Sequence, residues 1–112
     1  NRILELQLRP SGLASCTEFA VLPKHASGRD EDNLPDGMAV DAWGNLWVAH
    51  YGMGALQVLD QRGRLVTTIP TGIPLTSNLC FLGFDPLVAM VTGGFGEPGP
   101  GRVVFITMEQ SV

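Results

Sequence analysis

Short apolar runs alternate with turns that contain glycine or proline along the whole chain. The runs are about six residues long and are mostly separated by two to five turn residues, which is typical of an antiparallel β-meander. Glycine occurs 14 times and proline 8 times among 112 residues, which leaves no room for a long helix. The pattern predicts nine strands, at 2–8, 17–22, 37–41, 46–51, 55–60, 65–70, 78–83, 87–92 and 102–107.

The predicted strands repeat. With a step of 41 residues, Met38 aligns with Leu79, and the next strand keeps this step because Gly52 aligns with Gly93. A four-stranded unit of about 40 residues is the period of a β-propeller blade. We therefore predict an all-β fold, a partial β-propeller of about two blades. The expected parts of this single segment are the end of one blade at 1–23, a complete blade at 35–70, and a last blade lacking its outer strand at 77–108.

The composition limits the classes of partner. The chain is 45% hydrophobic, 16% charged and has a formal net charge of −4, so it is expected to fold around a core. It has no basic stripe, so we expect neither nucleic acid nor a membrane surface as a partner. Prolines and glycines interrupt the long uncharged stretch 65–84, which therefore does not predict a membrane-spanning helix.

The two cysteines, Cys16 and Cys80, lie far apart and belong to no metal-binding or redox motif. We expect free thiols that are buried or half-buried, because unpaired cysteine is usually buried. A disulfide is the alternative. Free thiols are typical of reducing compartments, so we expect a cytoplasmic location.

One stretch carries a family resemblance. The sequence "LPDGMAVDAWGNLWVAHYGMGALQVLDQRGRLVTTIP", residues 34–70, resembles the characteristic blade of the regucalcin and gluconolactonase (senescence marker protein) family of six-bladed β-propellers. "TSNLCFLG" and "TGGFGEPGPGRVVFI" resemble the last blade of that family, and "NRILELQL" resembles a strand two blades earlier. The resemblance covers the whole chain but only the C-terminal portion of a family member.

The resemblance implies a metal-dependent hydrolase of sugar lactones or related esters. Members of the family hold one divalent cation in the central channel, through a glutamate, an asparagine and the aspartate of Pro-Asp-Gly. Only the aspartate maps onto this chain, as Asp36, which is thereby implied to be both a metal ligand and a catalytic residue. Calcium is the expected metal, with zinc and manganese as alternatives. Because the other ligands are absent, we expect an incomplete site and an inactive isolated chain.

The residues around Asp36 allow a structural reading as well. Pro-Asp-Gly is a common turn tripeptide in which aspartate bonds nearby backbone N–H groups. In the functional reading, Asp36 lies on a loop just before a strand, Pro35 stiffens the loop, and Gly37 lets the backbone turn inward. Asn78, on the equivalent loop of the next blade, is predicted to contact substrate.

Other polar and aromatic residues are expected to have structural roles. The acidic stretch 29–33 predicts a solvated loop, with a lid over the channel as the alternative. The loop "GGFGEPGPG" lacks the Lys-Ser/Thr pair and helix of a phosphate-binding loop. Residues expected to pack or to close turns are His50, Asp41, Asp60, Trp43 and Trp47.

Two functions follow from these observations. The first is the C-terminal part of a gluconolactonase-like hydrolase, whose partner is a small-molecule lactone or ester. The second is a non-catalytic propeller fragment that acts as a binding or self-assembling module. Incomplete blades at both ends of the chain expose strand edges and apolar faces. We therefore expect a homo-oligomer, or association with the remainder of the same propeller.

Overall fold

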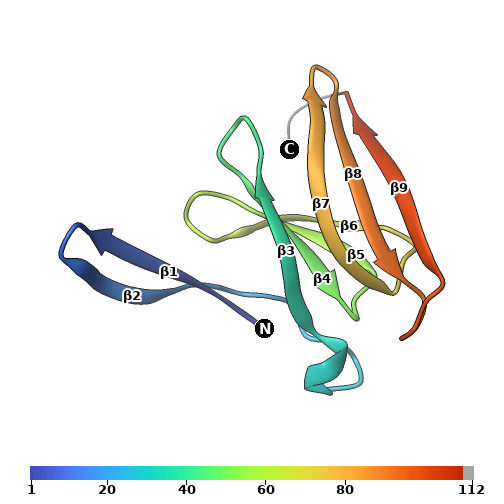
Figure 1. Ribbon diagram of the computed structural model, residues 1–112, viewed down its shortest axis with the longest axis horizontal. Helices are drawn as coiled ribbons and strands as arrows, with labels where there is room; N and C mark the ends of the chain where they lie inside the picture. The colour runs from blue at the N-terminus through green and yellow to red at the C-terminus, as the bar shows by residue number, and fades with distance from the viewer. Residues whose placement is uncertain (110–112) are drawn as a thin grey trace.

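Residues 1–109 of the computed structural model form three antiparallel β-sheets (Figure 1). Strands follow one another in chain order within each sheet, as in a meander. One 3-10 turn, η1 (Asp30–Asp32), precedes the second sheet. The strands are β1 (Arg2–Arg9) and β2 (Gly12–Val21) in the first sheet, β3 (Leu34–Val40), β4 (Leu46–Tyr51), β5 (Ala55–Leu59) and β6 (Leu65–Pro70) in the second, and β7 (Leu75–Phe84), β8 (Leu87–Gly94) and β9 (Gly101–Met108) in the third.

The predicted meander is confirmed. Each of the nine strands in the described residues overlaps one of the nine apolar runs found in the sequence. The largest differences are at strand starts, since β2 begins at Gly12 and β7 begins at Leu75. No helix in the described part of the chain is long and apolar enough to cross a membrane.

The main core lies between the second and third sheets. Strands β4 and β5 are buried over nearly their whole length, as expected for the middle strands of a sheet covered on both faces. Trp47 is fully buried and packs edge-on against Phe81 of β7, with ring centroids 5.2 Å apart. Trp43 packs edge-on against Phe84. Both tryptophans therefore pack between sheets, as predicted.

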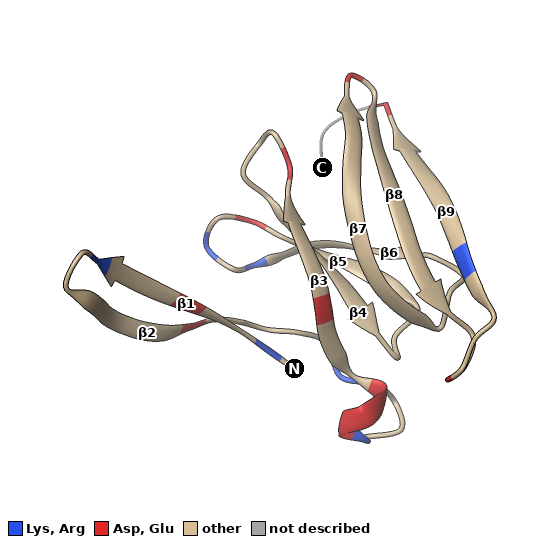
Figure 2. Cartoon of the chain, viewed as in Figure 1, with Lys and Arg blue, Asp and Glu red and all other residues tan. Residues whose placement is uncertain are grey.

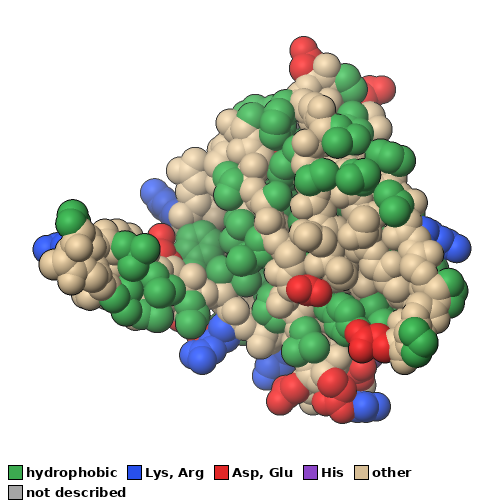
Figure 3. Space-filling model, viewed as in Figure 1, with side chains coloured by type: hydrophobic (Ala, Val, Ile, Leu, Met, Phe, Trp, Pro, Cys, Tyr) green, Lys and Arg blue, Asp and Glu red, His purple; other side chains and the backbone are tan. Residues whose placement is uncertain are grey.

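A smaller core attaches the first sheet. Ile3, Ala20 and Leu22 pack against Val48 and Leu59 of the second sheet. Beyond this contact the β1–β2 hairpin extends away from the other sheets (Figure 1). Apolar side chains gather on its visible face (Figure 3). Exposed apolar residues of the hairpin are Leu4, Leu6, Leu8, Leu13 and Val21.

The burial predicted for the cysteines is wrong. Cys16 and Cys80 are free thiols, and both are exposed. Cys16 pairs with Leu6 in the projecting hairpin, where no second sheet covers it. Cys80 follows Leu79, which faces the core, so the alternation of a strand places Cys80 on the opposite face.

Two turns are closed by aspartates, as predicted. The Asp41 carboxylate accepts hydrogen bonds from the backbone N–H groups of Trp43 and Asn45, each at 2.9 Å, and from the Trp47 indole at 3.0 Å. Asp60 accepts backbone hydrogen bonds from Arg62 and Arg64, which lower its pKa. The carboxylates of both aspartates are therefore engaged in hydrogen bonds within their own turns.

Candidate functional site

Asp36 lies on a β-bulge in β3. Pro35 pairs with His50 and Met38 pairs with Val48, so Asp36 and Gly37 together stand opposite the single residue Ala49. The sequence had placed Asp36 on a loop before the strand, and that placement is wrong. The strand starts earlier, at Leu34, and accommodates the extra residue by bulging. Bulges re-aim side chains, and they are common next to functional sites.

The same irregularity recurs one blade further along the chain. In β7, Thr76 pairs with Gly93 and Asn78 pairs with Thr92, which leaves Ser77 as the extra residue. Ser77 is 41 residues after Asp36, the step of the sequence repeat. Asn78 therefore lies within a strand rather than on the predicted loop. The bulge is thus a shared property of the first strands of both sheets.

Gly37 and Asn78 are in direct contact across the two sheets. A Cβ atom on residue 37 would lie 2.1 Å from the Asn78 Oδ1 atom and 2.9 Å from the Asn78 Cα atom. The φ angle of Gly37 is not positive, so the expected need for an unusual backbone turn is not the reason for glycine. Close approach is the reason. Asn78 Oδ1 also accepts a hydrogen bond from the Leu79 N–H at 2.9 Å.

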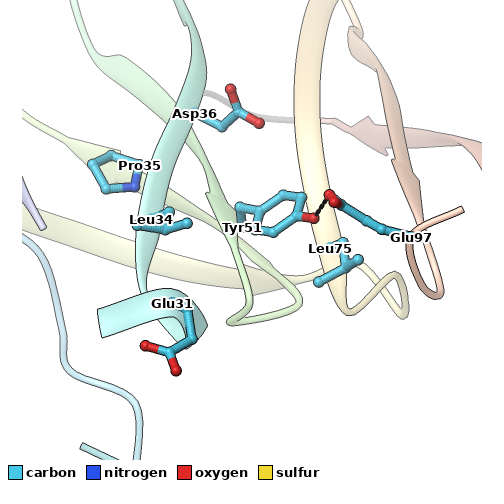
Figure 4. Close-up of a pocket in the computed structure, with 7 residues that line it drawn as sticks. All are labelled: Glu31, Leu34, Pro35, Asp36, Tyr51, Leu75 and Glu97. Carbon is cyan, nitrogen blue, oxygen red and sulfur yellow. Dashed lines mark hydrogen bonds between the residues drawn. The ribbon is translucent and has the colours of Figure 1, made fainter. Parts of the chain in front are cut away.

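An open pocket of about 750 Å³ lies beside the bulge. Figure 4 shows the Asp36 carboxylate projecting from β3 on the side of Tyr51 and Glu97, with Pro35 on the opposite side and Glu31 apart, on η1. The Tyr51 hydroxyl donates a hydrogen bond to the Glu97 carboxylate. Residues lining the pocket are Glu31, Leu34, Pro35, Asp36, Tyr51, Leu75 and Glu97. Asn78 lines a separate small pocket on β7 and β8.

Three carboxylates line the pocket, and they differ in their hydrogen-bond and ion-pair partners. Acidic residues stand out on η1 and in the middle of β3 (Figure 2). A backbone hydrogen bond and the Arg29 guanidinium, 2.6 Å away, lower the pKa of Glu31. The Glu97 carboxylate accepts the hydrogen bond of the Tyr51 hydroxyl. Within residues 1–109, no side-chain hydrogen bond or ion pair engages Asp36. Asp36 is thus the carboxylate in this pocket that is open to a ligand.

The described residues do not bring together a group of three or more His, Cys, Asp or Glu side chains able to hold a metal ion. The Asp36 carboxylate is exposed and offers hard oxygen donors, which suit calcium, manganese or zinc. The donor chemistry therefore fits a divalent cation.

A chain of side-chain hydrogen bonds runs from Thr68, which is exposed, through the buried Gln57 and His50 to Asn33 at the start of β3. Gln57 Nε2 donates to His50 Nδ1 at 3.0 Å, and Thr68 Oγ1 donates to Gln57 Oε1 at 2.6 Å. Because Nδ1 accepts, the proton of the neutral ring is on Nε2, which donates to Asn33 Oδ1. Burial lowers the pKa of His50 to about 4, and His50 is fully buried. The predicted structural role of His50 is confirmed.

The acidic stretch 29–33 is only partly the solvated loop that was predicted. Residues 30–32 are largely accessible and form η1. Asn33, in contrast, is buried against His50, and this part of the prediction is wrong. A side-chain amide can be buried where its hydrogen bonds are made. The partner of Asn33 is His50, which lies 17 residues later in the sequence.

Comparison with known proteins identifies the family. The model of the family "SMP-30/Gluconolactonase/LRE-like region" matches residues 11–93. The chain belongs to this family. The match covers the bulge of β3, the hydrogen-bonded chain from Thr68 to Asn33, and the sheet contact between Gly37 and Asn78.

Curated relatives of this family member include vertebrate regucalcins. The chain is 38% identical to regucalcin of Xenopus laevis over 58 residues, which is 51% of this chain and 19% of that protein. Human regucalcin is 41% identical over 54 residues, which is 47% of this chain and 18% of that protein. An uncharacterised protein of Sulfolobus acidocaldarius is 30% identical over 76 residues, 67% of this chain and 28% of that protein. The matches thus span only 18% to 28% of these relatives' length.

A solved structure confirms the predicted fold. A luciferin-regenerating enzyme matches with a TM-score of 0.69 at 19% sequence identity, over 93% of this chain and 36% of that chain. At this identity the likeness concerns the fold alone. The three sheets are therefore a partial β-propeller, as the repeat of the sequence predicted.

Four residues of this family member's site region were not predicted from the sequence: Gln57, Asn33, Tyr51 and Glu97. Gln57 is a polar residue inside the apolar run "ALQVLD", and a polar residue in a fully buried strand signals a buried partner. Asn33 was grouped with its exposed neighbours. The pairing of Tyr51 with Glu97 joins segments 46 residues apart, and no local pattern indicates it.

Proposed function

We propose that this chain forms the C-terminal part of a metal-dependent hydrolase that opens sugar lactones or related esters. Family membership over residues 11–93 supports the lactonase type. The observation that carries the proposal is Asp36, an unengaged carboxylate on a bulge, facing an open pocket. A carboxylate that lies on a bulge beside a pocket, and that has no hydrogen-bond or ion-pair partner in the protein, is suited to bind a ligand.

Asp36 has two roles in this proposal. It contributes one oxygen ligand to a divalent cation, calcium first and zinc or manganese as alternatives. When bound, such a cation polarises a carbonyl group and lowers the pKa of water. Asp36 is also the base that accepts a proton from the attacking water. The remaining ligands come from residues outside the described part of this chain.

The other pocket residues bind and orient the substrate. Leu34 and Leu75 form an apolar wall, and the Tyr51–Glu97 pair supplies polar groups at its edge. Such a mixture suits a small, mostly uncharged ring with hydroxyl groups. Asn78, placed against Gly37 on the neighbouring sheet, is proposed to contact a substrate hydroxyl. Exposed free thiols support the cytoplasm as the proposed compartment.

The test compares two variants of the longer protein that carries this segment. Asp36→Asn should abolish metal-dependent hydrolysis of gluconolactone, because asparagine is a weaker metal ligand and no base. Asp85→Asn is the matched control, since Asp85 lies in the exposed turn between β7 and β8, at the end of β7 away from the pocket. Hydrolysis that survives Asp36→Asn would overturn the catalytic role.

A non-catalytic binding or self-assembling module is the second candidate. The observation that favours it is the exposed apolar row on the β1–β2 hairpin, which includes Leu8, 73% exposed. The two candidates separate in the same assay. A longer protein that hydrolyses no lactone with calcium, zinc or manganese supports the module and contradicts the hydrolase.

A further inference from the structure

The direction of Asp36 depends on where β3 enters its bulge. Side chains alternate between the faces of a strand, so a slip of one residue would turn Asp36 away from the pocket. After the bulge, Met38, Ala39 and Val40 pair with β4 and fix the register. Before the bulge the ladder is short, because it contains only the pairs of Leu34 and Pro35.

The short ladder is also weakened by proline. Pro35 stands opposite His50 and has no N–H group to donate. The backbone therefore offers few hydrogen bonds that would resist slippage on this side of the bulge. Another contact is needed to hold the strand entry in place.

The His50 side chain supplies that contact. Its Nε2–H donates to Asn33 Oδ1, immediately before β3, and its other nitrogen is held by Gln57. His50, Gln57 and Asn33 are all buried, so water does not compete for these bonds. Gly52 then packs directly on η1, since a Cβ atom there would lie 2.4 Å from the Asp32 carbonyl carbon.

We infer that His50 is a positioning residue for Asp36. Its hydrogen bond to Asn33 fixes the register at which β3 enters the bulge, and thereby the direction of the Asp36 carboxylate. The inference rests on the proposed function for its chemical consequence, because only a ligand-binding Asp36 needs a fixed direction. The register itself is measurable without metal or substrate.

The experiment uses four variants, studied by NMR without metal and by lactone hydrolysis in the longer protein. His50→Leu and Asn33→Ala each remove the hydrogen bond, the second without changing the histidine. His50→Gln keeps a donor at the position of Nε2. Val58→Ala is the matched control, because Val58 is fully buried in β5 but takes no part in the hydrogen bonds that lead to Asn33.

In His50→Leu and Asn33→Ala, amide protection of Asp36 and Gly37, relative to global unfolding, should fall about tenfold or more, as expected for a lost buried hydrogen bond. The cross-strand NOEs that pair Pro35 with residue 50 should weaken in both. His50→Gln should restore both signals, and Val58→Ala should not alter them. If His50→Leu does not fold, Asn33→Ala decides.

Activity separates this inference from the proposed function. If the longer protein hydrolyses lactones, kcat/KM should fall about tenfold or more in Asn33→Ala and recover in His50→Gln. Unchanged protection and NOEs in Asn33→Ala would overturn the positioning role, whatever the activity. Disturbed NOEs in a protein that hydrolyses no lactone would leave the positioning role supported and the hydrolase contradicted.

Discussion

The backbone of Gly37 lies directly against the Asn78 side chain, although the two residues belong to different sheets. The space that a side chain on residue 37 would need is filled by the Asn78 Cγ and Oδ1 atoms. Strands β3 and β7 therefore meet at the bulge that carries Asp36. The contact joins the candidate site to the packing of neighbouring blades.

Gly37→Ala should lower the free energy of unfolding by about 1–3 kcal/mol, because a methyl group has no room beside Asn78. Urea denaturation of the two proteins measures the change. Asn78→Gly in the same chain should recover part of the loss. The control is Gly83→Ala, where the nearest atom to a Cβ is 3.7 Å away. Equal losses at the two glycines would contradict the close-contact explanation.

Asp36 should determine weak metal binding by this chain. With one open carboxylate, calcium or zinc is expected to bind in the millimolar range, as in poorly completed oxygen sites. Calorimetric titration should show this binding lost in Asp36→Ala and kept in Asp85→Asn. Micromolar binding that survives Asp36→Ala would instead indicate the acidic stretch 29–33.

Stability should depend on pH through His50. Its pKa is lowered to about 4 in the folded chain and is near 6.5 in the unfolded chain, because burial disfavours the charged ring. Between these values the unfolded chain binds the extra proton, so stability falls as the pH drops from 6.5 toward 4. Urea midpoints at several pH values should show a shallower decline for His50→Gln. Parallel declines in both proteins would show that His50 does not titrate in this way.

The strands could be predicted because the information for them is local. Apolar alternation and glycine turns recur within a few residues, and the repeat of 41 residues shows how the strands group. Asp41 and Asp60 were recognisable for the same reason, since their backbone N–H partners lie two to four residues away. Asp36 could be singled out through its family resemblance.

The details that orient Asp36 could not be predicted because they depend on distant contacts. Gly37 is required by Asn78, 41 residues later, and Asn33 is buried by His50, 17 residues later. The exposure of Cys80 depends on which face of β7 lacks a covering sheet. Single-sequence patterns report periodicity and turn chemistry, whereas these features belong to the packing of one blade on another.

The chain should associate at micromolar concentration. In the described residues β1 pairs with β2 alone and β9 with β8 alone, so both sheets have unpaired edges. Exposed apolar side chains lie on both of these edge strands, including Leu8 on β1 at 73% exposure and Phe105 on β9 at 62% exposure. Covering such a face gains about 25 cal/mol for each Å² of apolar surface removed from water. A two-fold dimer is the simplest assembly that covers both copies of one face.

Sedimentation velocity measures this association and locates the surface that causes it. Leu4, Leu6 and Leu8 alternate along β1 and share one face of the hairpin. Leu6→Lys combined with Leu8→Lys should therefore shift the chain toward the monomer, because charges on this face would have to be desolvated on association. Leu65→Lys, on the outer strand β6, is the matched control and should leave association unchanged. A compact, stable wild-type monomer near 12.0 kDa would show that the exposed faces do not drive assembly.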